Sequence, residues 1–499
     1  MTLRTLVRGS TIYAAGTMLA RLGGFVLLPI YLQLMSRSEY GLVALMTSIV
    51  GFLGIAYKLG LDGALMRLHF DTAPEQRAGL YRSLLAVTIS FAAGASLLLA
   101  FAAGPFFETI FFGVPFMPYG ALALAIAFVG SGDYVPSILY RSTQQPGRFL
   151  AFNLSGFALT SALSLALVAS GLGAAGALLG QLIGGAVMLV VAIVIAARLR
   201  GPMWLPQSIE PALRFSVPIV PHQVAQWTMR LSDRWLLGLL LTLPTTQRLE
   251  AIGAYSVGYQ LGSVVTIASA SFNAAWTPYL YRVGDTDRGP RIFRNVTTIT
   301  LAGFFWIALG LSAFAPEIVA VIANPGYAVA AQVLPVVAFG AACQAVYTML
   351  VGVIFLRRRT KQLPLITMVS AVANVVLNVL LIPIYGVMGA AVTTLLAYLL
   401  SATLTFAFAR RIYPLELDRW RIAVVVVLCV GGALVARLVD GGAGEIVRSG
   451  LLHGAIVLGV ALVLALVLRA PVRALRRDAA RVPEEPRESF SVSTGTTAS

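Results

Sequence analysis

Apolar residues dominate the chain in stretches of about 20 residues, separated by short polar segments that are rich in arginine. A helix of this length crosses a hydrocarbon core of about 30 Å. We therefore expect an all-α, polytopic membrane protein with about fourteen transmembrane helices. The predicted helices are Ser10–Met35, Tyr40–Met66, Leu80–Gly104, Phe116–Leu139, Phe149–Ser170, Ala174–Ala197, Ala212–Leu243, Ile252–Tyr279, Val296–Ile322, Val333–Leu356, Leu363–Ile384, Gly386–Ala409, Trp420–Val439 and Leu451–Leu468.

The basic residues set the predicted orientation. With the N-terminus in the cytoplasm, 28 of the 36 Lys and Arg residues fall in inward-facing segments, four in outward loops and four within spans. Such an excess is typical of cytoplasmic loops, so both termini are predicted to be cytoplasmic. The first apolar stretch resembles a secretory signal, but it is long and contains Arg21, which favours a retained helix.

Landmarks recur at an offset of 213 residues, which indicates an internal repeat. Arg21 matches Arg234, and Arg148 matches Lys361. The smaller matches are Gly173, Gly176 and Ala177 with Gly386, Gly389 and Ala390, and, after a slip of one residue, Gly41 with Gly253. Two parallel six-helix bundles are predicted, in the manner of alternating-access transporters. One irregular bundle with chance similarity is the alternative.

The repeat gives the predicted domain organisation. An N-terminal six-helix lobe spans 1–200 and a C-terminal six-helix lobe spans 211–412. An additional helix pair follows at 413–469. The tail at 470–499 is rich in Arg, Glu, Pro, Ser and Thr, a composition that predicts a disordered cytoplasmic segment.

Composition excludes several classes of protein. The chain is 58% hydrophobic and only 11% charged, whereas a soluble protein carries about 25% charged residues. Topology explains the excess of basic residues, so we expect no nucleic-acid partner. Cys343 and Cys429 lie in apolar runs, and the three histidines show no metal-ligand spacing, so no metal and no cofactor is expected.

A polar stripe runs along the predicted helix Ala212–Leu243. At 100° per residue, seven residues share an arc of about 120°. They are His222, Gln223, Gln226, Arg230, Asp233, Arg234 and Leu237. Charges at the centre of a span are costly against lipid, so the stripe is predicted to face protein or a wet cavity. The alternative is that Asp233 pairs with Arg230 or Arg234 and merely locks two helices together.

Further charges lie within or beside the predicted spans. Arg21 lies in the middle of the first helix, and Arg67 lies at the cytoplasmic end of the second. Lys58 and Asp62 are four residues apart, a spacing that favours an ion pair. Asp133 lies near the inner end of the fourth helix. The in-span charges leave a small positive excess, and arginines in a cleft suit an anion, above all phosphate.

Uncharged polar residues are also scattered through the spans. They are Asn153, Gln181, Gln260, Asn273, Gln344, Asn374 and Asn378. Their amides could bind sugar hydroxyls, although hydrogen bonding between helices is the commoner explanation.

Several motifs resemble the bacterial oligosaccharide-lipid flippases of the polysaccharide transport group, in the multidrug/oligosaccharidyl-lipid/polysaccharide exporter superfamily. The first helix, with "LARLGGF" at 19–25, also looks like that of the related lipid II flippases. The other motifs are "LPIYLQLMSRSEYGLVAL" at 28–45, "SDRWLLG" at 232–238, "AIGAYSVGYQLG" at 251–262, "FNAAWTPYLYR" at 272–282 and "RRTKQLPLITMVSAVANVVLNVLLIPIYGVMGAAVTTLLAYLL" at 358–400. The likeness extends over residues 1–412.

The resemblance implies translocation of an undecaprenyl-pyrophosphate-linked oligosaccharide across the bacterial cytoplasmic (inner) membrane, for cell-surface polysaccharide biosynthesis. It places Arg21 in a central cavity and matches Asp62 to a carboxylate before Gly-Ala. Substrate-binding candidates are Arg21, Lys58, Arg67, Arg230 and Arg234. Candidates for ion coupling or charge pairing are Asp62, Asp133 and Asp233. Polysaccharide polymerase or assembly proteins are candidate partners.

Other functions remain as alternatives. A drug/cation antiporter of the multidrug and toxin extrusion type would favour twelve spans and an acidic cavity. A membrane-embedded glycan polymerase or transferase needs a convergent set of catalytic residues, which the short outward loops do not offer. We expect a transporter rather than an enzyme. Neither lysine of the chain lies in a nucleotide-binding loop motif, so an ion gradient, the membrane potential or substrate supply would provide the energy.

Overall fold

The computed structural model describes residues 23–439 and 446–480, and the regular secondary structure of these residues is entirely helical. Helix is present in each of the fourteen predicted ranges. The long helices are 23–34, α2 (Arg37–Lys58), α4 (Arg77–Ala103), α6 (Ala121–Val129) with α7 (Tyr134–Ser142), α8 (Pro146–Leu167), α9 (Gly173–Ala197), α11 (Val220–Leu240), α12 (Thr245–Gly262) with α13 (Val264–Val283), α14 (Gly289–Ala313), α16 (Ala328–Leu356), α17 (Leu363–Tyr385), α18 (Val387–Ile412), α19 (Arg419–Leu438) and α20 (Ile446–Val467). The shorter ones are α3 (Leu61–Asp71), α5 (Phe107–Ile110), α10 (Ile209–Ser216), α15 (Ala315–Ile322) and α21 (Arg469–Ala480).

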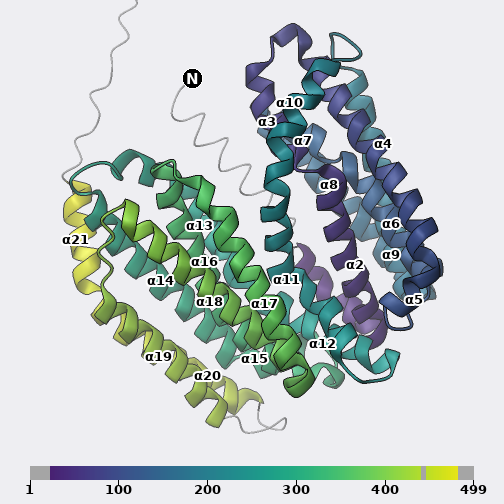
Figure 1. The fold of residues 1–499 in the computed structure, drawn as a ribbon. Coiled ribbons are helices and arrows are strands. Elements are labelled where there is room, and N and C mark those ends of the chain that lie inside the picture. Colours follow the sequence, from purple (N-terminus) through teal and green to yellow (C-terminus); the bar gives the residue numbers. More distant parts are fainter. Residues whose placement is uncertain (1–22, 440–445, 481–499) are drawn as a thin grey trace, which may run out of the picture.

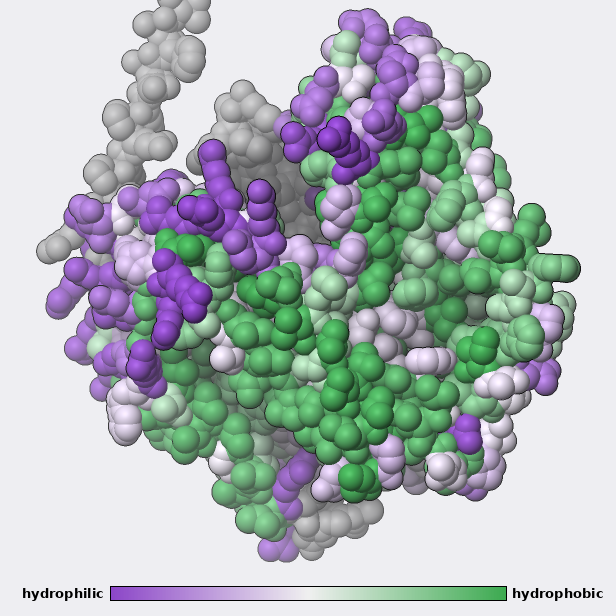
Figure 2. Space-filling view, viewed as in Figure 1, coloured by the Kyte–Doolittle hydropathy of each residue, from purple (hydrophilic) through white to green (hydrophobic). Residues whose placement is uncertain are grey.

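Length and apolarity mark these helices as membrane spans. Within the described residues, ten helical segments are long and apolar enough to cross a membrane, and one of them, Pro146–Ala197, contains both α8 and α9. Large apolar side chains are exposed along α4, α9, α17, α19 and α20, as expected of helices that face lipid. Figure 2 shows hydrophilic residues over the upper ends of the molecule and a broad hydrophobic band below them.

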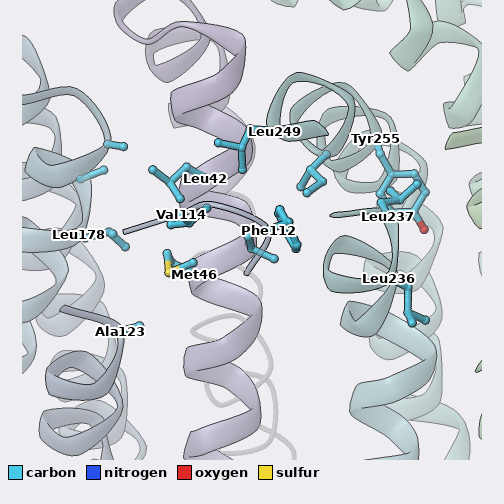
Figure 3. Close-up of a cluster of buried hydrophobic side chains, with 14 of the residues drawn as sticks. Leu42, Met46, Phe112, Val114, Ala123, Leu178, Leu236, Leu237, Leu249 and Tyr255 are labelled. Carbon is cyan, nitrogen blue, oxygen red and sulfur yellow. The ribbon is translucent and has the colours of Figure 1, made fainter. Parts of the chain in front are cut away.

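The helices form two bundles, with α2–α9 in one and α13–α18 in the other (Figure 1). Between the bundles, α11 packs on α17 and on α2, while α12 packs along both α2 and α16. A shared hydrophobic cluster joins the bundles at this place (Figure 3). It brings Leu42 and Met46 of α2 together with Leu237 of α11 and with Leu249 and Tyr255 of α12. The bundles therefore have a common core at one end.

Several predicted helices are divided in the structure, and two differences change the candidate sites. The predicted second helix is interrupted between α2 and α3, because Leu59 and Gly60 both have left-handed backbone angles, with φ of 48° and 70°. The predicted disordered tail begins with helix α21, which packs against α14 and α20. Buried Pro471 and the partly buried Leu475 give α21 an apolar side, and this contact stabilises a helix in a segment of polar composition. Residues 481–499 lie outside the described residues.

Candidate functional site

A cavity of about 590 Å³, with both apolar and charged side chains in its lining, lies between the first bundle and α11. We call it the central cavity. Its charged lining residues are Lys58 at the end of α2, Asp62 in α3, Asp133 beside α7 and Arg230 in α11. The α11 side also contributes His222, Gln223, Gln226, Trp227 and Leu231, and the α2 side is made small by Gly51 and Gly54. Charges from separate helices thus meet in one hollow.

The polar stripe of α11 is divided between this cavity and the protein core. His222, Gln223, Gln226 and Arg230 line the central cavity. One turn further along, Asp233 is 0% exposed and Arg234 is 6% exposed. The stripe therefore continues from the cavity into the shared core between the bundles.

Lys58 pairs with Asp133 rather than with Asp62. Its Nζ lies 2.6 Å from Oδ1 of Asp133. The predicted pair of Lys58 and Asp62 required an unbroken helix, and the left-handed residues Leu59 and Gly60 end that helix immediately after Lys58. Asp62 still lines the same cavity and makes no ion pair with any described residue. The cavity consequently holds two basic and two acidic side chains, so the positive excess expected from the sequence is not found in the described lining.

Arg230 is exposed and lies where two hollows meet. Besides the central cavity, it lines a second cavity of about 440 Å³ between α11, α13 and α16. Among the described residues, no other charged residue lines that cavity. Its uncharged polar lining is Tyr259, Gln260, Ser263, Thr266, Ser269, Gln344 and Thr348. The guanidinium of Arg230 makes no ion pair with the part of the chain that the structure describes. It is therefore available to a ligand in either hollow.

Asp233 is held by hydrogen bonds from three other helices. Its Oδ2 accepts from the hydroxyl of Tyr255 at 2.5 Å and from that of Thr394 at 2.8 Å. Its Oδ1 accepts from Nδ2 of Asn378 at 3.0 Å, and Asn378 also donates to Oδ1 of Asn374 at 3.2 Å. A buried carboxylate needs such donors because desolvation is costly. This predicted candidate is thus the centre of an oxygen-rich network in the core.

Arg234 is also buried, but no carboxylate among the described residues pairs with it. Its guanidinium lies over the ring of Tyr259, 4.4 Å from the centroid, and 5.4 Å from that of Tyr255. Its Nη1 donates to the carbonyl of Arg230 at 2.6 Å. The aromatic faces compensate part of the charge. The alternative of an Asp233–arginine lock does not describe this arrangement.

The remaining candidates lie elsewhere. Arg67 of α3 is 64% exposed, with Nε 3.5 Å from Oδ2 of Asp71, and its guanidinium lies over Phe215. It lines neither of the two cavities. Arg21 lies outside the described residues. Of the uncharged candidates, Gln260 donates to the carbonyl of Gly24 at 3.2 Å and accepts from the hydroxyl of Tyr40 at 3.2 Å, which is the helix-to-helix role.

The interface between the bundles is tightest where α2 crosses α12. A Cβ added to Gly41 would lie 1.8 Å from the carbonyl oxygen of Leu249, and one added to Gly253 would lie 2.5 Å from that of Arg37. Beside this contact, Nη2 of Arg37 lies 3.4 Å from Oε2 of Glu250. The two glycines that match in the internal repeat therefore face each other, a contact that the repeat alone did not predict.

Sequence reasoning missed the partners of these charges. Tyr255 and Tyr259 both lie against Arg234. They are four residues apart, and this spacing could have indicated an aromatic face on one helix. Asn374 and Asn378 were considered for sugars, but they belong to the Asp233 network. Among the described residues, no group of three or more His, Cys, Asp or Glu could hold a metal ion.

Comparison with solved structures defines the class of fold. The structure is similar to the lipid II flippase MurJ in an inward closed conformation, with a TM-score of 0.67 and 14% identity, over 94% of this chain and 100% of that one. It is also similar to a mutant of the MATE transporter VcmN of Vibrio cholerae, with a TM-score of 0.55 and 17% identity, over 82% and 96%. A third match is a MATE protein in the straight conformation, with a TM-score of 0.57 and 14% identity, over 84% and 96%.

These likenesses show a polytopic membrane fold like that of the lipid II flippase and the MATE transporters. Residues 32–328 match the family model described as "Polysaccharide biosynthesis protein", and the chain belongs to that family. No curated protein matches the sequence.

Proposed function

We propose that this protein is a lipid-linked oligosaccharide flippase. It would move an undecaprenyl-pyrophosphate-linked glycan from the cytoplasmic to the outer leaflet by alternating access, and so supply the synthesis of O-antigen, other lipopolysaccharide or exopolysaccharide. The observation that carries the proposal is the central cavity, where an arginine without a described carboxylate partner faces amide and charged side chains. A diphosphate and its sugars cross hydrocarbon only with such polar contacts, while the polyprenyl tail can stay in lipid.

In this proposal Arg230 is the principal phosphate ligand. A guanidinium binds phosphate oxygens through two parallel hydrogen bonds. Lys58 would contribute after exchanging Asp133 for the phosphate, and Arg21 would join them if it lies where the family resemblance implies. Arg234 would act indirectly, because its carbonyl contact fixes the turn of α11 that carries Arg230. The second cavity offers hydroxyls and amides for the sugars.

The direction of opening follows from the charge of the loops. The central cavity lies near the α2–α3 junction, the end of the bundle that bears the loops predicted to be cytoplasmic. The tight contact of α2 with α12 would then close the outer side, which corresponds to an inward-facing state. In the proposed cycle the bundles rock, the α2–α12 contact opens, and the cavity closes toward the cytoplasm.

Asp233 is the strongest candidate for ion coupling. Its carboxylate could exchange one of its hydrogen-bond donors for a proton or a cation. Tyr255 and Thr394 lie on α12 and α18, so a change at Asp233 would alter how α11 packs against both. Asp62 and Asp133 would then serve as charge partners in the cavity.

Complementation tests the proposal. In cells lacking their own flippase, R230Q should fail to restore surface glycan at a normal protein level. K361Q removes an exposed positive charge outside the cavity and should restore it. Native mass spectrometry should find a polyprenyl diphosphate bound to the purified wild-type protein and depleted in R230Q. Full complementation by R230Q, with the lipid retained, would contradict the proposal.

A drug/cation antiporter is the second candidate, and one observation favours it. The described lining of the central cavity is charge-balanced, with the half-buried Asp62 available to a cation. Efflux of a cationic dye that depends on Asp62 and is lost in D62N, with no effect of R230Q on surface glycan, would select this function.

A further inference from the structure

We propose that α19, α20 and α21 form a binding site for the phosphate headgroup of an anionic phospholipid. A cavity of about 550 Å³ lies where the end of α20 meets α21 and the start of α19. Four arginines line it: Arg421, Arg469, Arg473 and Arg477. Its apolar lining includes Val424 and Leu466. This site lies apart from the central cavity and does not depend on the proposed function.

Helix α21 is docked so that its arginines face the hollow. Arg469, Arg473 and Arg477 follow each other at intervals of four residues, which places them along one side of a helix. Pro471 is buried, and Leu475 packs against a core cluster that includes Ile292 and Phe293 of α14. The docking contact thus fixes the orientation of the basic side.

Three of the four arginines have no ion pair with a side chain that the structure describes. Arg421 pairs with Asp418 and donates from Nε to the carbonyl of Val467 at 3.2 Å. Arg469, Arg473 and Arg477 are exposed and have no ion pair with a described residue. Like charges four residues apart destabilise a helix. A bound anion would remove this repulsion, so the geometry itself favours an anionic ligand.

The position of the site selects a lipid rather than a soluble anion. Trp420 is 76% exposed at the rim, as is typical of tryptophan at a membrane interface. Leu466, which is 53% exposed, continues the hollow onto the apolar surfaces of α19 and α20. Figure 1 places α21 across the ends of these two helices at the edge of the molecule. Basic pockets between membrane helices and juxtamembrane basic helices bind anionic lipid headgroups in this way.

Three unneutralised arginines suit a headgroup with more than one phosphate charge. Cardiolipin is therefore the first probe, and phosphatidylethanolamine is the neutral comparison. A lipid-borne phosphate could also come from a polyprenyl diphosphate, and inorganic diphosphate represents the soluble anion. The test includes all four.

Native mass spectrometry of the delipidated full-length protein measures each affinity. Cardiolipin should bind the wild-type protein more tightly than phosphatidylethanolamine does, and R473Q should weaken cardiolipin binding by about tenfold, the effect of losing one charged hydrogen bond. R476Q removes an equal charge from the same helix outside the cavity and should leave the affinity unchanged. If R473Q and R476Q weaken cardiolipin binding equally, the binding depends on the overall positive charge of the helix rather than on the cavity, and the proposal is overturned.

The other probes distinguish the sources of phosphate. If R473Q weakens only polyprenyl diphosphate, or if inorganic diphosphate binds as well as cardiolipin, the phospholipid assignment is wrong. A second measurement covers the case in which R473Q does not fold. Brominated cardiolipin should quench the fluorescence of the wild-type protein more than brominated phosphatidylethanolamine does, and the difference should vanish in W420F. Equal quenching by the two lipids would overturn the proposal.

Discussion

Replacing Gly41 with alanine should weaken the contact that closes the interface between α2 and α12. The added Cβ would lie 1.8 Å from the carbonyl oxygen of Leu249 and 2.9 Å from the backbone nitrogen of Gly253. Both are backbone atoms and cannot rotate away, so the helices must separate by about 1 Å or more, which forfeits much of their dispersion contact. Overpacking of this kind costs about 1–3 kcal/mol. The equilibrium between the closed and the open interface should shift by about 5- to 150-fold.

Cysteine accessibility measures this shift. Leu249 is buried in the shared core at the crossing, so L249C reports when the interface opens. The native Cys343 and Cys429 are both buried and would be replaced by alanine in the background. A membrane-impermeant maleimide should label L249C faster in G41A than in the otherwise unchanged protein, by the factor given above.

The matched control is G94A, because a Cβ at Gly94 of α4 has no heavy atom within 4 Å. It should leave the labelling rate unchanged. A cysteine at the fully buried Val425 should stay unlabelled in both variants, which separates opening of the interface from unfolding. An unchanged labelling rate in folded G41A would refute the view that close backbone packing holds this end shut.

Three further substitutions test other contacts. In D233N the side chain cannot accept from two hydroxyl donors and an amide donor at once, so the free energy of unfolding should fall by about 1–3 kcal/mol. If transport by D233N still depends on the ion, Asp233 is not the coupling residue. Arg82 donates to the carbonyls of five residues that end α9 and follow it. R82Q should lower the free energy of unfolding by at least the value of one charged hydrogen bond, about 1.5–3 kcal/mol, and so lower the thermal unfolding temperature. An unchanged unfolding temperature would contradict this. The ring nitrogens of His453 lie 2.8 Å from Oε1 of Glu317 and 3.1 Å from the carbonyl oxygen of Ala436. H453Q can keep only one of these contacts and should therefore increase the rate of protease cleavage between α19 and α20. A wild-type cleavage rate in H453Q would show that these contacts do not hold the two helices together.

The helices could be predicted from sequence because the bilayer decides their length and their apolarity. The same rule cannot locate a break inside a span. Leu59 is an ordinary apolar residue, and nothing in its composition signals a left-handed backbone. The polypeptide turns there because α3 packs on α10 and α7, and these are tertiary contacts. For this reason the sequence predicted Asp62 as the partner of Lys58, whereas the structure shows Asp133.

The candidate site was predicted in part for a similar reason. Helical periodicity placed Gln226 and Arg230 on one face of the helix, and both residues line the central cavity. Periodicity cannot locate the point along α11 where the cavity gives way to the protein core, so the predicted polar face also included the buried Asp233 and Arg234. The partners of Asp233 come from α12, α17 and α18, and only the fold brings these together. The helix α21 was missed because composition measures polarity and does not reveal that one apolar side is docked.

Helix α2 contributes to both the central cavity and the tight α2–α12 contact, one at each end of the helix. At one end, Gly41 lets α2 meet α12 backbone to backbone, so that the two helices can separate and close again as rigid units. At the other end, Lys58 lines the central cavity, and the left-handed residues Leu59 and Gly60 follow it directly. Between them, the indole of Trp227 donates to the carbonyl of Ser48 at 2.9 Å and ties α2 to α11. With the Trp227–Ser48 hydrogen bond as the pivot of α2, opening of the interface at Gly41 requires closure of the cavity at Lys58. W227F removes this hydrogen bond, so each end of α2 should still move but the two movements should no longer be coupled. Cysteine labelling at Leu249 and at Gly54 would then no longer change in opposite directions.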